Sequence, residues 1–233
     1  MCVYRYCVAR LSVQLCVVSM TAHLHRQETG APLDAGLRHL IRIAGAIAGA
    51  SEQRFRAVMV EALNQVDADS VEEIILQSYL FAGFPRALNA ARVWRAVSGR
   101  PAGVKNVEAS KGDIEKWREL GERTCAVVYG DAYEPLRRNI RALHPVLDEW
   151  MIVDGYGKVM SRPGVELRVR ELCVVAACAV SGQQRQLHSH LHGALNAGAS
   201  LEEVGAVLDA LDDLISAEDL ARYHQLLRKV ATQ

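Results

Sequence analysis

The sequence is poor in aromatic residues and has no net charge, and each shortage argues against a class of protein. Phe, Trp and Tyr make up 6% of the 233 residues, whereas half of the chain is hydrophobic. With Ala, Leu and Val abundant, this composition favours helices over sheets. Lys plus Arg and Asp plus Glu both number 27, which argues against bulk electrostatic binding to nucleic acid or to an anionic membrane. No run approaches the roughly 18 apolar residues of a bilayer-spanning helix.

The cysteines include no Cys-x-x-Cys pair, and a chain of this length needs no disulfide scaffold. We therefore predict a reducing, cytoplasmic compartment. The six cysteines are Cys2, Cys7, Cys16, Cys125, Cys173 and Cys178. Residues 1–19 combine Arg5 and Arg10 with a short apolar run that Gln14 interrupts. We interpret them as an upstream extension with Met20 as the working start, and a secretory signal is the alternative.

Apolar residues recur at helical spacing along the chain, and no convincing period-two strand is found. Ser70 and Glu73 form a predicted capping box that starts one of the helices. The expected helices are two within 34–62, then 70–82, 86–97, 111–122, 133–143, a short one after His144-Pro145, 166–181, 183–197, one from Ser200, and 217–231. Loops are expected at 155–157 and 161–164, and a linker at 98–103.

The order of these features repeats along the chain. Ala62-Leu63-Asn64 precedes the Ser70 segment as Ala194-Leu195-Asn196 precedes the Ser200 segment. Upstream, residues 40–49 parallel residues 172–182. The pattern predicts an all-α, two-repeat architecture: an extension at 1–19, a degenerate repeat at 20–103 and a second repeat at 104–233. Such units expose apolar faces, so we also expect an oligomer.

Two titratable residues fall on the apolar faces of neighbouring predicted helices. His190 lies within an apolar stripe of helix 183–197, and Glu171 lies on the apolar face of helix 166–181. The stripes consist of Leu187, Leu191, Ala194 and Leu195 in one helix and Val174, Val175 and Cys178 in the other. A carboxylate in apolar surroundings is costly unless it is paired, so His190 is the expected partner. Such a pair in a dry cleft can hold a proton near neutral pH. A satisfied core histidine or a structural ion pair is the alternative.

Four further polar residues are candidates for binding a substrate. Gln186 and Gln183 precede the histidine by one and two helical turns, on the same edge of the helix. Arg162 and Arg170 add positive charge just before the glutamate, and arginine binds carboxylates through its forked donors. The alternative is that Arg162 bonds backbone carbonyls in a loop and that Arg170 is a solvated helix residue.

His188 and His192 are spaced i, i+4, as in a helical metal site. They lie on the polar face of the helix, away from His190, and no third ligand is evident nearby. We therefore predict no metal. The sequence also has no glycine-rich phosphate-binding loop, which makes nucleotide chemistry unexpected.

Several stretches of residues 126–208 carry a resemblance to a known family. They are Tyr129-Gly130-Asp131, Gly155-Tyr156-Gly157, Ser161-Arg162-Pro163-Gly164, Arg170-Glu171-Leu172, Gln186-Leu187, His190, Gly193-Ala194-Leu195-Asn196 and Gly198-Ala199-Ser200-Leu201-Glu202-Glu203. In this combination they resemble the carboxymuconolactone decarboxylase family of the AhpD-like superfamily. Residues 36–95 resemble a degenerate first copy, in which Tyr79 and residues 82–85 are similar to the segment that usually closes this domain. The resemblance implies an all-helical AhpD-like fold with two tandem repeats, assembled as a homotrimer or homohexamer.

The resemblance implies two chemistries. The superfamily's peroxidase branch relays protons through a glutamate, a Cys-x-x-Cys pair and a histidine. Glu171 and His190 match the glutamate and the histidine, but Gln183 and Gln186 occupy the cysteine positions. Because thiol–disulfide exchange requires thiolates, that activity is disfavoured. The decarboxylase branch uses no cofactor and acts on a γ-lactone that bears a carboxylate.

In the decarboxylase branch, His190 would donate the proton and Glu171 would orient it. Gln186 and Arg162 would bind oxygen atoms of the lactone or carboxylate. The first repeat has His39 and Val58 near the corresponding positions, so at most one site per chain is expected. The second repeat continues into 209–216 without the aromatic–Gly–Pro closing segment, so the resemblance does not extend to a segment that often helps form the pocket.

The leading hypothesis is a cofactor-independent carboxy-lyase for a small carboxylic acid or lactone, with no nucleic-acid or membrane partner. A non-catalytic helical scaffold or binding protein is the alternative from another class, and an oxidoreductase that uses another cysteine is a third. A solvent-reachable cleft with an arginine beside Glu171 and His190 would favour an enzyme. A sealed pair without an adjoining cavity would favour a scaffold.

Overall fold

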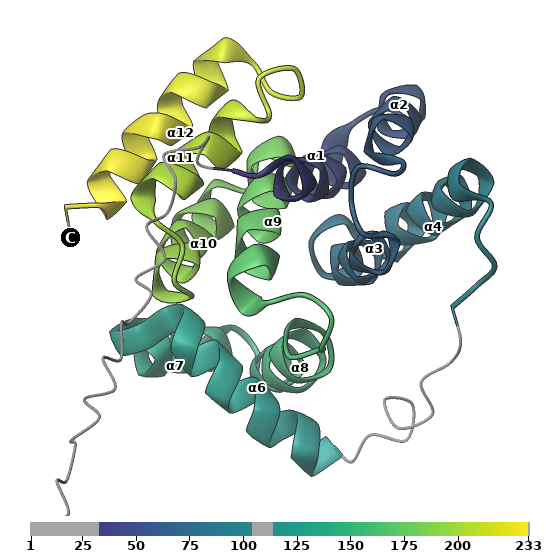
Figure 1. The fold of residues 1–233 in the computed structure, drawn as a ribbon. Helices are drawn as coiled ribbons and strands as arrows, with labels where there is room; N and C mark the ends of the chain where they lie inside the picture. The colour runs from purple at the N-terminus through teal and green to yellow at the C-terminus, as the bar shows by residue number, and fades with distance from the viewer. Residues whose placement is uncertain (1–32, 104–113, 233) are drawn as a thin grey trace, which may run out of the picture.

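The computed structural model describes residues 33–103 and 114–232, and within these ranges it contains helices and no β-strand (Figure 1). The predicted all-α fold is therefore confirmed. The predicted extension at 1–19 lies outside the described residues. Among the described residues, no helix is both long and apolar enough to cross a bilayer.

Four helices make up the first described segment. They are α1 (Ala35–Gly49), α2 (Glu52–Ala62), α3 (Ala68–Ala82) and α4 (Phe84–Ser98). Helix α3 ends at Gly83, whose φ of 81° favours glycine. Helix α4 starts directly afterwards, with Pro85 in its first turn, where the missing backbone N–H of proline costs nothing. The sequence thus predicted these four helices and the break between α3 and α4.

The start of α3 differs from the prediction. Ser70 does not cap this helix, because α3 begins earlier, at Ala68. Its N-cap is Asp67, whose carboxylate accepts the backbone N–H of Ser70 at 2.8 Å. Glu73 is therefore free of a capping role, and its side chain bonds elsewhere. At the corresponding place in the second half, Ser200 and Glu203 do form a complete capping box.

The second described segment contains the remaining helices. They are α6 (Ile114–Tyr129), the 3-10 turn η1 (Gly130–Ala132), α7 (Tyr133–Leu143), α8 (Pro145–Trp150), the π-helix η2 (Met151–Met160), α9 (Leu167–Val180), α10 (Gln184–Asn196), α11 (Leu201–Asp209) and α12 (Ala217–Val230). The predicted helix at 111–122 corresponds to α6, which continues to Tyr129. Residues 111–113 lie outside the described ranges.

The predicted loop at 155–157 is wrong, because these residues belong to η2. Gly121 of α6 packs directly against the backbone of η2, and Gly157 of η2 packs directly against the backbone of α6. A side-chain carbon on Gly121 would collide with the Ile152 carbonyl, and one on Gly157 would collide with the Trp117 carbonyl. The glycines therefore serve close helix packing rather than a turn. π-Helical turns of this kind often occur at functional sites.

Helix α9 lies at the centre of the molecule. Figure 1 shows it between α1 on one side and α10 on the other, and both helices pack against it. Every residue from Arg170 to Ala179 is buried. The sequence predicted that only one apolar stripe of this helix faces the core. The structure instead buries the helix on all sides, as is typical of a helix with few polar residues. Helices α1 and α9 contain the segments that the repeat pattern makes equivalent, but the repeat itself and its boundaries stay a prediction.

Candidate active site

Glu171 and His190 meet inside the protein. The Nδ1 atom of His190 lies 2.8 Å from the Oε2 atom of Glu171, a hydrogen-bond distance. Glu171 is fully buried on α9, and His190 is 5% exposed on α10. The expectation that these two side chains turn inward and pair is confirmed. A carboxylate that holds one ring nitrogen fixes the orientation of the imidazole and leaves the other nitrogen for a ligand.

Gly193 provides the space for this pair. A Cβ atom on Gly193 would stand 2.7 Å from Oε2 of Glu171 and 2.7 Å from Cγ1 of Val128. The carboxylate therefore lies directly against the backbone of α10. The second oxygen, Oε1, is buried and has no hydrogen-bond partner among the described residues. An unsatisfied buried acceptor is rare in folded proteins and calls for a functional explanation.

Asn196 of the same helix secures α10 against α6. Its Nδ2 atom donates a hydrogen bond to the carbonyl oxygen of Val128 at 2.9 Å. This contact lies next to Tyr129, the last residue of α6. The Ala-Leu-Asn motif found in the sequence thus positions the helix that carries His190.

His190 also lines a cleft of about 510 Å³, which is large enough for a small organic molecule. Helices α3, α6, α8, η2 and α10 contribute its walls. The lining residues are Tyr79, Leu80, Phe81, Tyr129, Leu147, Trp150, Met151, Asp154, Gly155, Tyr156, Met160 and His190. The rings of Phe81 and Tyr129 meet the imidazole edge-on, with centroids 5.5 Å and 6.4 Å away. The imidazole is therefore held on one side by a carboxylate and on others by aromatic rings.

Two tyrosines, Tyr129 and Tyr156, line the same cleft. Burial raises the pKa of Tyr129, and it raises the pKa of Tyr156 well above its ordinary value. Their rings meet edge-on, with centroids 6.1 Å apart. Both phenols are thus neutral at physiological pH, so they can donate hydrogen bonds to an oxygen atom that gains negative charge.

The predicted substrate-binding residues lie elsewhere. Gln183, the N-cap residue of α10, and Gln186 within the helix are exposed, and neither belongs to the lining of the cleft. Arg162 donates two hydrogen bonds to Glu73, at 2.9 and 2.7 Å. Of the substrate-binding set, the structure thus brings none to the cleft.

The position of Arg170 contradicts both roles expected of it, binding a substrate and lying in solvent. Its side chain has no exposed surface. Its guanidinium donates to Glu73 at 2.8 Å and also to Gln77. Three backbone carbonyls accept its remaining bonds, those of Val165, Arg162 and Pro163. This arginine is therefore committed to holding the loop before α9, because a buried cation must be paired and hydrogen-bonded.

Glu73 is the residue that the sequence interpretation missed. Desolvation raises the pKa of its carboxyl group, but the hydrogen bonds from Arg162 and Arg170 outweigh it and leave the pKa below its ordinary value. Through these bonds Glu73 ties α3 to the start of α9. The signal in the sequence was a pair of arginines, Arg162 within the Ser161–Gly164 segment and Arg170 shortly after it. Arginines that become buried require a carboxylate partner. The capping-box interpretation had already assigned Glu73 to another task.

The described cysteines are poor nucleophiles. Cys125, Cys173 and Cys178 are free and buried. Burial raises the pKa of each thiol to about 12, so the reactive thiolate is scarce at neutral pH. These positions give no support to an oxidoreductase that uses another cysteine.

The two remaining histidines of α10 do not assemble a metal centre with other described residues. The rings of His188 and His192 stack edge-on, with centroids 5.0 Å apart. Within the described ranges, no group of three or more His, Cys, Asp or Glu side chains is placed to hold a metal ion.

Comparison with known proteins finds a family match over residues that include the pair. Residues 149–216 match a sequence model of the Carboxymuconolactone decarboxylase family, and this range contains η2, Glu171 and His190. A curated relative is Peroxisomal protein 2 of Schizosaccharomyces pombe, which is 28% identical over 135 residues. That match covers 58% of this chain and 63% of the relative, so the chain spans less than two thirds of the relative's length. Residues 149–216 are thus similar to the Carboxymuconolactone decarboxylase family, and the described part of the chain is all-α.

Proposed function

We propose that this chain is an enzyme that transfers a proton to or from a carbon atom of a small carbonyl compound. His190 carries the proton, and Glu171 orients the imidazole. The observation that supports this most is the buried 2.8 Å contact between the two side chains, placed where His190 also lines a cleft of about 510 Å³. A general acid or base needs to lie within hydrogen-bond reach of its substrate, and Nε2 of His190 is the ring atom left for that task.

Decarboxylation of a small carboxylated lactone is the reaction of this kind that the family's name describes, and it is the form that the proposal takes if the cleft admits a carboxylate. The carboxylate would leave as CO₂, and the electron pair of the broken bond would pass to the conjugated lactone carbonyl. A proton from His190 would then reach the carbon that lost CO₂. The neutral hydroxyls of Tyr129 and Tyr156, which line the cleft, would stabilise the enolate oxygen. All of these steps use side chains of the protein and need no cofactor.

The cleft favours this proposal over a non-catalytic scaffold. A buried Glu–His pair that serves only stability needs no adjoining space, whereas His190 borders a cavity of ligand size. The unpartnered Oε1 atom of Glu171 also fits a functional role better than a structural one. A cytoplasmic location belongs to the same proposal, since the relative's name places only that relative in peroxisomes.

The test compares His190→Ala and Glu171→Gln with the wild-type chain and with His188→Ala. His188 is the matched control, because it lies on the same helix but outside the lining of the cleft. Two readouts are measured: CO₂ release from carboxymuconolactone, and exchange of carbon-bound hydrogen for solvent deuterium in a panel of small ketones and lactones. We expect His190→Ala to lower kcat/KM by about 1,000-fold and Glu171→Gln by about 100-fold, with His188→Ala unchanged. Wild-type turnover that survives His190→Ala would eliminate the proposal.

A further inference from the structure

The aromatic side chains of this chain are concentrated in the cleft. The whole sequence has three Phe, three Trp and seven Tyr. Five of these line the cleft, namely Tyr79, Phe81, Tyr129, Trp150 and Tyr156. A core can be filled by Leu, Val and Ile, as it is elsewhere in this protein. Aromatic rings gathered around an open space instead provide flat surfaces on which a ring compound can stack.

The cleft has no positive charge to offer an anion. Among the described residues that line it, there is no Lys or Arg, and Asp154 is an acid. Arg162 and Arg170, which the sequence suggested for binding a carboxylate, are both bound to Glu73. A carboxylate that entered would lose its hydration without gaining a counter-charge, and it would approach Asp154.

A cation has no free partner there either. Asp154 pairs with Lys158, one helical turn later on η2, at 2.5 Å. The Lys158 ammonium lies over the ring of Trp117, 4.5 Å from its centre, and neither of these two residues lines the cleft. The acid of the cleft is therefore already neutralised. Together with the missing cation, this leaves uncharged ligands as the class that the lining can accept.

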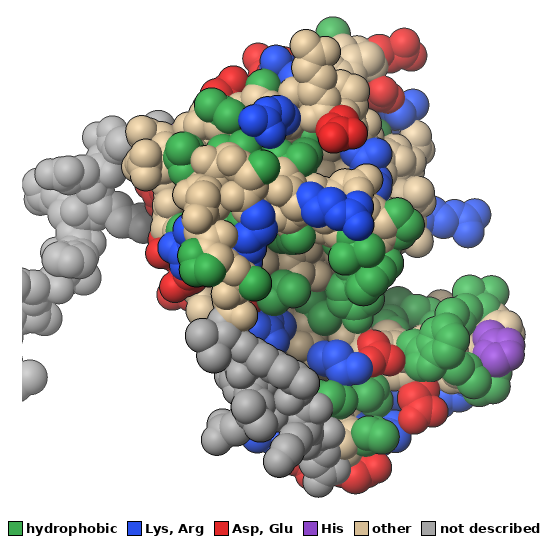
Figure 2. Space-filling view, turned by 90° about the vertical axis from the view of Figure 1, so that its right-hand side faces the viewer, with side chains coloured by type: hydrophobic (Ala, Val, Ile, Leu, Met, Phe, Trp, Pro, Cys, Tyr) green, Lys and Arg blue, Asp and Glu red, His purple; other side chains and the backbone are tan. Residues whose placement is uncertain are grey.

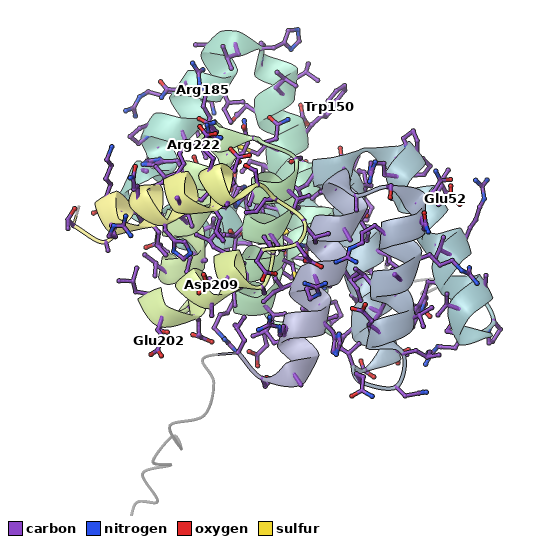
Figure 3. The ribbon with its side chains drawn as sticks, turned by 90° about the horizontal axis from the view of Figure 1, so that it is seen from above. Glu52, Trp150, Arg185, Glu202, Asp209 and Arg222 are labelled. Atoms are coloured by element: carbon purple, nitrogen blue, oxygen red, sulfur yellow. The ribbon has the colours of Figure 1, made fainter. Side chains whose placement is uncertain are left out.

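The mouth of the cleft is apolar as well. Leu147 is 46% exposed and Trp150 is 59% exposed, and both belong to the lining. Figure 3 labels Trp150, which projects outward from the body of the molecule. In Figure 2, hydrophobic side chains gather over the lobe at the lower right and over the surface beside it. A ligand thus meets apolar surface from its first contact onwards, which favours a compound with little hydration to lose.

We propose that the cleft binds a neutral ring compound that carries a carbonyl or lactone oxygen, and that it discriminates against carboxylates. The rings of the lining stack on the compound, and the hydroxyls of Tyr129 and Tyr156 bind its oxygen. The ligand class rests on the lining alone, whereas the reaction rests on the proposed function. For a neutral substrate, the reaction is an isomerisation without loss of CO₂. His190 removes a proton from the carbon next to the carbonyl, and the resulting enolate takes a proton back at another carbon.

The test uses two probes of the same shape. Coumarin is a neutral aromatic lactone, and coumarin-3-carboxylate has the same rings and lactone with an added negative charge. Their binding to the full chain is measured by calorimetry at neutral pH. We expect coumarin to bind at least tenfold more tightly than its carboxylate. Equal or tighter binding of the carboxylate would overturn the proposal, and so would failure of both probes to bind at millimolar concentration.

A pair of leucine variants checks that the preference arises in the cleft. Leu147→Arg places a cation in the lining, at a position exposed enough to tolerate it. Leu143→Arg adds the same charge to a 78% exposed leucine on the neighbouring helix α7, outside the lining. We expect Leu147→Arg to strengthen carboxylate binding at least tenfold and Leu143→Arg to leave it within twofold. An equal gain in both variants would show a general charge effect and would contradict the proposal.

Glu171→Gln separates this inference from the proposed function. Glu171 stands behind His190 and does not line the cleft, so coumarin should bind within threefold of its wild-type affinity while proton transfer is lost. Coumarin preference without any proton transfer would refute only the proposed function. A preference for the carboxylate together with turnover that depends on His190 would refute only the ligand class.

Discussion

The backbone of Gly193 lies against the carboxylate of Glu171, so closely that a methyl group on Gly193 would stand 2.7 Å from Oε2. Glu171 is fully buried and is bound at that same oxygen by His190. The geometry of the pair therefore depends on a residue that has no side chain. A carboxylate wedged between two helices cannot move aside without breaking its hydrogen bond.

The first prediction is that Gly193→Ala damages the site and the fold together. Alanine normally stabilises a helix relative to glycine, but here its methyl group would push against Glu171 and Val128. We expect a loss of about 2 kcal/mol in the free energy of unfolding and about 100-fold in kcat/KM. Urea denaturation and the deuterium-exchange assay measure the two effects.

Gly205→Ala is the control for this substitution. Gly205 also lies inside a helix, α11, but a Cβ atom there would meet only the side chain of Leu227, at 3.8 Å. Because that is ordinary van der Waals contact, Gly205→Ala should be neutral or slightly stabilising. Equal behaviour of the two variants would show that the close approach to Glu171 has no energetic consequence.

The second prediction concerns Glu73 and acid stability. Glu73→Gln would leave Arg170 buried without its counter-charge, which we expect to cost about 3 kcal/mol of stability. The carboxyl pKa of Glu73 is lowered in the folded protein, so its contribution is present above the unfolded-state pKa. That contribution is lost as the pH falls through the folded-state value. The wild type should therefore lose stability in acid more steeply than Glu73→Gln does.

Urea denaturation at neutral pH and at several acidic pH values measures both effects. Glu61→Gln is the comparison, because Glu61 is 53% exposed and its distance to Arg42 is 3.9 Å. Exposed ion pairs contribute little, so this variant should differ from the wild type by less than about 1 kcal/mol. Parallel acid profiles of the wild type and Glu73→Gln would contradict the role assigned to Glu73.

The third prediction concerns the buried thiols. Burial raises the pKa of Cys125, Cys173 and Cys178 to about 12 from the ordinary value of 9.0. Because the folded-state pKa values are raised, the thiols favour the folded state below the unfolded-state pKa. Stability should fall as the pH rises from about 9 towards 12.

A thiol reagent checks the same point at neutral pH. In a variant with Ser at positions 2, 7 and 16, the three remaining cysteines should react only as fast as the protein unfolds. Full reactivity in 6 M urea is the positive control. Rapid modification of the native variant would show that a thiol is accessible, and it would reopen the possibility of an oxidoreductase.

The fourth prediction is self-association. Large apolar side chains are exposed on helix α4, where Phe84 is 63% and Leu88 is 45% exposed. Exposed apolar surface of this kind favours burial against another copy of the chain. Light scattering at micromolar concentration should give the mass of a trimer or hexamer, and Phe84→Glu should lower it. A monomeric mass for the wild type would contradict the prediction.

The pairing of Glu171 with His190 could be predicted because both residues break the apolar pattern of their own helices. The start of α11 also has a local signal, the capping box of Ser200 and Glu203. The role of Arg170 could not be predicted in this way. Its partner Glu73 is 97 residues away in the sequence, and no local pattern links them.

The lining of the cleft shows the same limit. Tyr79 and Phe81 come from α3, Trp150 from α8 and Tyr156 from η2, so their gathering around His190 depends on how separate helices dock. The helical state of residues 155–157 likewise depends on the contact between Gly121 and Gly157. From the local sequence alone, Gly155 and Gly157 predict a turn.

The amino-acid sequence alone determined most of the helices and the inward direction of Glu171 and His190, because hydrophobic periodicity and capping act between residues a few positions apart. Only the tertiary structure decided what surrounds the imidazole. In the folded protein, Arg162 and Arg170 bind Glu73, and aromatic rings from distant segments line the cleft. Such contacts arise only when separate helices pack against one another.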